Sequence, residues 1–217
     1  MTSMQRQIEA IEQFVRTELA AEHSGHGFDH IQRVVNNARL IQQKELAADL
    51  TTIILAALLH DVIDEKIATD VEQARQKVKT KLTENGIQDG QQTAIFDIID
   101  HMSFSKNLNQ HQTLSLEGQI VQDADRLDAI GAIGIGRTFM YGGAHDGVAY
   151  DPEIQPRAEL TKENYREPST VINHFYEKLF KLAATMNTQA AREIAQARTD
   201  FMHQFVDQYL AEWTGQR

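Results

Sequence analysis

Apolar residues recur every three or four positions along most of the chain, which is the spacing of one face of an α-helix. The first segment shows this with Ile8, Ile11 and Leu19. No alternating apolar and polar run of convincing length appears, so the pattern predicts an all-α fold. The predicted helices cover residues 3–21, 28–44, 47–62, 67–85, 89–102, 115–130, 168–186 and 188–213.

The stretch from 131 to 167 interrupts this pattern. It contains GAIGIGR, YGGAHDG and the prolines Pro152 and Pro156, and it shows no sustained period. We therefore predict a long loop containing glycine and proline near residues 131–167, and loops of this length are more often functional than idle. No linker, repeat or low-complexity tract appears, so a single domain over residues 1–217 is expected.

The composition is that of a globular protein without a membrane span. The chain has 217 residues, of which 41% are hydrophobic, and this is enough for one core. No run of about 18 apolar residues occurs, which argues against a membrane partner. The first residues, MTSMQRQIEAIEQF, lack the apolar region of a signal peptide, so we expect a cytoplasmic location.

Charge and cysteine content narrow the chemistry. The formal net charge of -10 argues against a nucleic acid as the main partner but leaves a phosphorylated small molecule open. There are no cysteines, so disulfides, thiolate metal sites and a cysteine nucleophile are excluded. Any metal ion must be bound by histidine and carboxylate side chains.

One apolar run ends in ionisable residues. Residues 55–66 read LAALLHDVIDEK, so five apolar residues lead directly into His60 and Asp61. Burying an imidazole and a carboxylate costs free energy unless something binds them. Further candidates lie on other predicted helices, where a helical bundle can bring them together: His26, His30, His101, Asp123, Asp125 and Asp128.

Each of these residues also has an ordinary explanation. A lone histidine at a helix start is more often a solvated or capping residue, and an acidic cluster is usually an exposed face paired with its own arginine. Two observations favour a metal site. The acids of QDADRLD are embedded in an apolar helix, and a mixed nitrogen and oxygen ligand set suits Mn, Fe, Zn, Ni or Co better than Ca or Mg alone.

The order of these residues resembles the HD-domain metal-dependent phosphohydrolase superfamily. His30, the adjacent pair His60 and Asp61, and Asp125 within ADRL carry the resemblance, together with GHGFDHIQRV, HMSFSK, QDADRLDAIGAIGIGR, YGGAHDG and HFYEKLFKL. The sequence from about residue 20 to 210 is similar to a bacterial branch of stand-alone HD proteins that resemble nucleotide pyrophosphohydrolases.

The resemblance implies a domain with a core at about 20–130 and C-terminal helices at 168–213. It also implies one divalent metal ion bound by His30, His60, Asp61 and Asp125. Manganese is favoured, and Mg, Co, Ni, Fe or Zn remain compatible. Binuclear relatives use more histidines between the HD pair and the last aspartate than this chain offers, so a single ion is expected.

Roles for other residues follow from the same resemblance. Asp64 and Glu65 match two acids of the guanosine-tetraphosphate hydrolases, so they are candidates for orienting or deprotonating the attacking water. Those relatives have His-Asn after ADRL where this chain has Asp128-Ala129, which argues against a strict alarmone hydrolase. The substrate-binding candidates are His26, Arg33, His101, Lys106, Arg126 and His145.

Several alternatives stay open at this point. Arg126 could pair with Asp123 or Asp128 instead of a substrate, and Lys106 could be a solvated lysine. Whether Asp123 or Asp128 contributes to the site is open, as is a homodimer formed through the apolar first and last helices. The sequence favours hydrolysis of a nucleotide or a related phosphorylated small molecule, such as a nucleoside triphosphate cleaved to monophosphate and pyrophosphate. The competing hypotheses are a non-catalytic nucleotide- or metal-sensing HD protein and a di-iron oxygenase.

Overall fold

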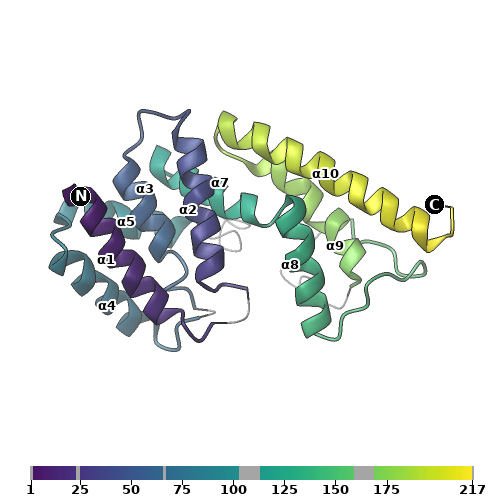
Figure 1. Cartoon of the computed structure of the whole chain (residues 1–217), viewed down its shortest axis with the longest axis horizontal. Coiled ribbons are helices and arrows are strands. Elements are labelled where there is room, and N and C mark those ends of the chain that lie inside the picture. The colour runs from purple at the N-terminus through teal and green to yellow at the C-terminus, as the bar shows by residue number, and fades with distance from the viewer. Residues whose placement is uncertain (1, 23–24, 66, 103–112, 159–168, 217) are drawn as a thin grey trace. The chain divides into compact units, whose positions relative to one another are not determined.

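The computed structural model describes residues 2–22, 25–65, 67–102, 113–158 and 169–216 (Figure 1). Every regular element among these residues is a helix, which confirms the all-α prediction. The helices are α1 (Ser3–Glu18), α2 (Phe28–Gln42), α3 (Leu50–Leu59), α4 (Val71–Glu84), α5 (Asp89–His101), α7 (Leu116–Asp128), α8 (Gly131–Ala144), α9 (Val171–Glu177), the 3-10 helix η1 (Leu179–Thr185) and α10 (Gln189–Trp213).

The chain divides into two compact units, residues 1–125 and residues 126–217. Helix α7 crosses the division, because its last three residues belong to the second unit. The expectation of one domain over the whole chain stays a prediction. None of the described helices combines enough length with enough apolar side chains to cross a lipid bilayer.

Helix α3 forms the centre of the first unit. Every residue from Thr52 to Leu59 is buried, which is typical of a helix that is apolar on all sides. Helices α1, α2 and α5 contact it, and α4 contacts α1 and α5 (Figure 1). The carboxylate of Asp49 accepts a hydrogen bond from the Thr52 N–H at 2.6 Å and so caps the first turn. The apolar run LAALL is therefore the core element that carries the following His60 and Asp61.

Two side-chain amides hold α7 in the first unit. Asn37 of α2 donates to the carbonyl oxygen of Ala124 at 3.1 Å, and Gln122 donates to the carbonyl oxygen of Met102 at 2.9 Å. Both amides are buried, where a hydrogen bond is costly to lose. They therefore fix the position of the helix turn that contains Asp125.

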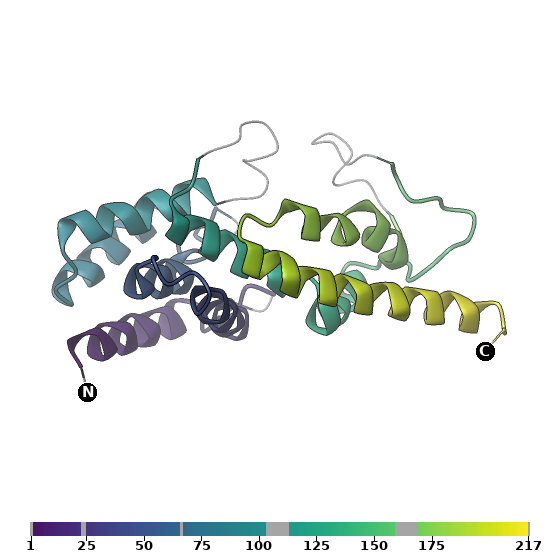
Figure 2. The same cartoon turned by 90° about the horizontal axis from the view of Figure 1, so that it is seen from above.

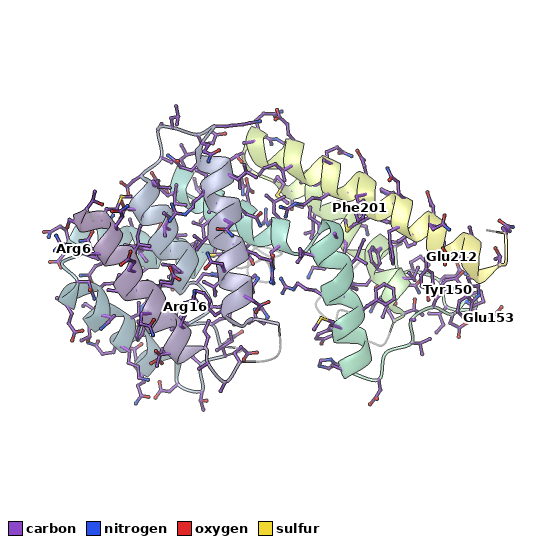
Figure 3. All side chains as sticks on the ribbon, viewed as in Figure 1. Arg6, Arg16, Tyr150, Glu153, Phe201 and Glu212 are labelled. Atoms are coloured by element: carbon purple, nitrogen blue, oxygen red, sulfur yellow. The ribbon has the colours of Figure 1, made fainter. Side chains whose placement is uncertain are left out.

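The second unit packs α8, α9 and η1 around the long helix α10 (Figure 2). The hydroxyl of Thr188 caps α10 by accepting from the Ala191 N–H. Phe175 of α9 is fully buried in this unit. Tyr150 lies beside the C-terminal end of α10, with its ring centroid 5.2 Å from that of Trp213, whereas Phe201 on the same helix is exposed (Figure 3).

Glu177, the last residue of α9, has a buried carboxylate that accepts four hydrogen bonds. Glu177 accepts from the Arg157 backbone N–H at 3.0 Å, from Arg157 Nε at 3.0 Å and from a terminal Arg157 nitrogen at 2.6 Å. The Ser169 hydroxyl donates to it at 2.9 Å. We call these three residues the Glu177 cluster; its carboxylate is completely satisfied.

The predicted loop at 131–167 is wrong over its first part, because residues 131–144 form helix α8. Two of the glycines there, Gly134 and Gly142, lie where a Cβ atom would collide with a neighbour. A Cβ at Gly142, for example, would collide with the side chain of Val171, so glycine lets α8 approach the start of α9. Residues 145–158 are non-helical, as predicted, and residues 159–168 lie outside the described part.

The single helix predicted at 168–186 is also wrong. Helix α9 ends at Glu177, Lys178 takes φ -135° and ψ -57°, and a 3-10 helix follows. Apolar residues at helical spacing continue through the break, so the periodicity alone could not reveal it.

Candidate metal centre

His60 is aimed into the centre by a backbone contact. It directly follows the last residue of α3, and its ring is buried. The Nδ1–H donates to the carbonyl oxygen of Ala57 at 2.8 Å, which leaves Nε2 with a lone pair that faces the neighbouring acids. Nε2 is buried and, among the described residues, has no hydrogen-bond partner.

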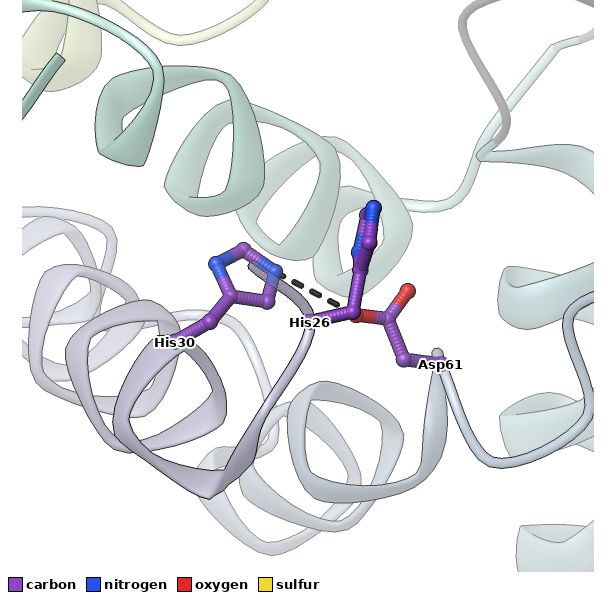
Figure 4. A group of neighbouring side chains, drawn as sticks. All are labelled: His26, His30 and Asp61. Carbon is purple, nitrogen blue, oxygen red and sulfur yellow. Dashed lines mark hydrogen bonds and ion pairs between the residues drawn. The ribbon is translucent and has the colours of Figure 1, made fainter. Parts of the chain in front are cut away.

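Asp61 is the shared neighbour of three histidines. Its Oδ2 lies 3.0 Å from His26 Nδ1 and 3.4 Å from His30 Nε2, and its Oδ1 lies 3.4 Å from His60 Nε2. Figure 4 shows Asp61 with His26 and His30, which come from the turn before α2 and from its first turn. All of Asp61 but 5% is buried.

The charges within this group shift the pKa values of Asp61 and His60. Burial alone would raise the pKa of Asp61, but the positive charge available on His60, His30 and His26 lowers it far below its usual value. Burial also works against the imidazolium of His60, yet the charges of Asp61 and Asp125 raise the pKa of His60 above its usual value. The carboxylates of Asp61 and Asp125 therefore favour a positive charge at the position of His60.

Asp125 closes the group from α7. Its Oδ1 lies 3.5 Å from His30 Nε2 and 3.9 Å from His60 Nε2, and 40% of its side chain is exposed. Two overlapping triads have donor atoms that all lie within 4.8 Å of one another, namely His26, His30 and Asp61, and His30, His60 and Asp125. The four residues predicted as metal ligands thus lie together, with His26 beside them.

This donor set fits a divalent transition metal. Imidazole nitrogens and carboxylate oxygens are the ligands such ions take in cysteine-free sites. The buried Nε2 of His60 gains a partner when an ion binds, and His60 is oriented by a backbone carbonyl as histidine ligands usually are. The exposed side of Asp125 leaves the group open to solvent on one side.

The two acids predicted to act on water differ in placement. Asp64 is half-buried, and its charge is one of those that raise the pKa of His60, so it lies in the field of the centre. Its backbone N–H donates to the carbonyl oxygen of Asp61, which places it one turn beyond that residue. Glu65 is exposed. Asp64 is the better positioned of the two.

The substrate candidates of the first unit carry local partners. Arg33 is paired with Asp29, one turn earlier on α2, at 2.7 Å. His101 donates from Nδ1 to the carbonyl oxygen of Asp97 at 2.9 Å, and 38% of its side chain is exposed. His26, also predicted to bind substrate, lies instead against the carboxylate of Asp61. Lys106 falls outside the described residues.

The remaining candidates belong to the second unit. Arg126 donates to the carbonyl oxygen of Thr185. His145 stacks on the ring of Tyr141, with ring centroids 3.9 Å apart. Both residues keep the role of substrate contact as a prediction only.

The two acids near Asp125 in the sequence, Asp123 and Asp128, are both buried. Asp128 is buried and pairs with Arg137 of α8. The sequence offered no signal for this partner, because residues 131–167 were expected to form a loop. Asp123 is fully buried. The contact of His26 with Asp61 was missed for another reason, since His26 lies outside any predicted helix and has no periodic position.

The chain is similar to several known proteins. A protein-family model described as HD domain matches residues 27–130. YpgQ of Bacillus subtilis is 40% identical over 204 residues, which cover 94% of this chain and 92% of that protein. Its crystal structure in complex with ADP has a TM-score of 0.75 at 35% identity and covers 97% of this chain and 96% of its own.

Two further crystal structures are similar over nearly the whole chain. A Lactobacillus plantarum protein is 53% identical, with a TM-score of 0.81 and coverage of 96% of this chain and 97% of its own. An HD-superfamily hydrolase from Bacillus thuringiensis is 39% identical, with a TM-score of 0.80 and coverage of 98% and 100%.

Proposed function

Since this chain belongs to the HD domain family, we propose that it is a divalent-metal-dependent phosphohydrolase that acts on a nucleotide. One observation carries the proposal, namely the convergence of His30, His60, Asp61 and Asp125 with donor atoms at 3.4–3.9 Å. The similar Bacillus thuringiensis protein is an HD-superfamily hydrolase, which supports the reaction class.

HD domains bind divalent metals, and His30, His60, Asp61 and Asp125 would hold one ion here. When bound, such an ion polarises a phosphoryl oxygen and lowers the pKa of its water toward about 7. Manganese suits a site of two imidazoles and two carboxylates. The net charge of -10 leaves the protein in need of a cation near a phosphate group.

Asp64 is proposed as the general base. Its half-buried carboxylate lies in the field of the centre and can accept a proton from the attacking water, whereas Glu65 is exposed and is assigned a supporting role. General-base catalysis of this kind typically contributes about 10²–10⁴-fold to the rate.

The substrate class rests on the ADP complex of Bacillus subtilis YpgQ. We extend nucleotide binding to this chain and propose a nucleoside triphosphate as substrate. The water oxygen forms a bond to the α-phosphorus, Asp64 takes the proton, and the bond from that phosphorus to the bridging oxygen breaks, which releases pyrophosphate and a nucleoside monophosphate. Arg33 and His101 are the described candidates of the first unit for phosphate contact, together with Lys106.

A nucleotide panel tests the proposal. Purified protein, freed of metal and supplied with Mn, Mg, Co or Ni, is given nucleoside mono-, di- and triphosphates while phosphate and pyrophosphate are measured along with metal per chain. One ion per chain with pyrophosphate release supports the proposal. Nucleotide binding without release would assign a sensor, and two irons with oxygen consumption would assign an oxygenase. Either result would overturn it.

A further inference from the structure

His26 occupies an unusual place in the metal centre. It lies before α2, between Gly25 and Gly27, and its Nδ1 is 3.0 Å from Asp61 Oδ2. We propose that Arg16 of α1 is a positioning residue, which acts through Phe28 to hold His26 against Asp61 and thereby orients that carboxylate in the metal centre. The inference rests on the proposed metal-dependent function.

Arg16 covers the ring of Phe28. The guanidinium carbon lies 3.6 Å from the ring centroid, the separation of a close cation–π contact. Glu12, one turn earlier on α1, accepts from Arg16 Nε at 3.2 Å and from a terminal nitrogen at 2.8 Å. These two bonds hold the guanidinium plane in place. Helix α1 thus presents a fixed flat cation to the first residue of α2.

Two glycines flank the His26 side chain. Gly25 adopts φ 103°, a conformation that other residues rarely take, and glycine restricts the backbone least. Gly27 is the N-cap of α2 but provides no side-chain cap bond. Phe28 is the nearest residue with a bulky side chain on the α2 side of His26. Its stack on Arg16 therefore limits where the His26 backbone can lie.

His26 in turn selects the orientation of Asp61. With Oδ2 accepting the His26 hydrogen bond, Oδ1 is the oxygen that lies nearest His60 Nε2, at 3.4 Å. Partners that orient a metal ligand are worth about 10–100-fold in metal affinity when they are removed. Loss of the Arg16 contact should therefore lower the metal affinity, even though Arg16 contacts none of the proposed ligands.

The chain offers a matched control. Arg75 covers the ring of Phe96 at 4.4 Å and is held by two bonds to Asp100, so it has the same chemistry as Arg16. It joins α4 to α5 and contacts none of the proposed metal ligands. Arg75→Ala therefore reports the cost of losing such a contact for stability alone.

The test measures Mn²⁺ affinity by equilibrium dialysis, and the ¹⁵N NMR signals of the histidine rings in metal-free protein. Arg16→Ala should weaken Mn²⁺ binding by about 10-fold, the low end of that outer-partner range, and should shift the His26 Nδ1 signal. Arg16→Lys, which keeps a cation over the ring, should recover part of both, and Arg75→Ala should change neither.

Unchanged affinity and an unchanged His26 signal in Arg16→Ala would overturn the inference, as would an equal loss in Arg75→Ala. Two Mn²⁺ ions per chain, falling to one in His26→Ala, would make His26 a ligand and overturn its orienting role. The NMR signal needs neither metal nor turnover. If no nucleotide is hydrolysed but the signal shifts as expected, the proposed function fails while the positioning role stands.

Discussion

Each unit buries carboxylates, and two of them, Glu177 and Asp61, have opposite surroundings. Glu177 receives four donor groups from Arg157 and Ser169, so its charge is neutralised and its oxygens are satisfied. Asp61 is surrounded by imidazoles, and one of them, His60, keeps a buried nitrogen without a hydrogen-bond partner among the described residues. Both residues are at most 5% exposed.

The difference separates a structural site from a ligand site. Burial of polar groups costs free energy, and the Glu177 cluster offsets that cost within the protein. The histidines around Asp61 offset the cost of burial only in part, and a bound cation would offset the rest. Buried charge by itself therefore does not indicate function. A buried ligand atom without a hydrogen-bond partner, such as His60 Nε2, does. Substitutions in the two places should accordingly affect different measurements.

The largest effect is expected for Asp61→Asn. The substitution removes the negative charge shared by three histidines, so Mn²⁺ affinity should fall by more than the roughly 100-fold that a lost outer partner costs. Turnover should disappear with the metal. Full activity of metal-depleted Asp61→Asn would end the proposal of a metal-dependent enzyme.

Asp64→Asn should act on the rate alone. The amide cannot accept the water proton, so kcat should fall by about 10²-fold or more while Mn²⁺ affinity is retained. Rates and metal content are measured on the same preparation, with Glu65→Gln as the neighbouring control, for which a smaller loss is expected. Loss of the metal in Asp64→Asn would instead make Asp64 a ligand.

Glu177→Gln should lower the stability of the fold and leave the metal affinity unchanged. It leaves the Arg157 guanidinium without its counter-charge, and since 22% of that side chain is exposed, the loss should be about 2–3 kcal/mol, below the range for a fully buried pair. Urea unfolding measures the loss, and Mn²⁺ affinity should be unchanged. A weakened metal affinity would contradict the separation of the two sites.

The smallest expected effect is on the stability of the fold at acidic pH, through His174. Burial and the charge of Lys178 lower the pKa of His174 to about 4 from its usual 6.5. The unfolded chain therefore binds a proton more readily, and stability should fall as the pH drops from about 6.5 towards 4. For a half-buried ring the loss should be about 1–2 kcal/mol. His174→Gln should show a flatter dependence in urea unfolding at each pH, and an unchanged slope would exclude His174 as the cause.

Much of the fold could be predicted because apolar spacing reflects burial directly. Helix α3 is an example, since its uninterrupted apolar residues are all in the core. Helix α8 could not be predicted, because its glycines look like turn residues until the neighbour they accommodate, Val171, is known. The break at Lys178 was likewise hidden, because a 3-10 turn continues the apolar spacing of the helix before it.

The site was predictable only where its residues follow core helices. His60 and Asp61 end the most apolar run in the chain, so the sequence itself indicates that they are buried. His26 is different, because no periodic pattern places a residue between two glycines. Its contact with Asp61 and the cover of Phe28 by Arg16 depend on how α1 and α3 approach the start of α2.

The burial of Thr52 to Leu59 in α3 has a consequence for synthesis on the ribosome. Its sequence LTTIILAALL leaves the ribosome after α1 and α2, but α5, which covers another of its sides, follows only after α4. At about 5–20 residues per second, this helix remains partly uncovered for some seconds. The apolar residues that precede His60 and Asp61 are thus exposed for that time in the newborn chain, where they offer a binding surface to a chaperone.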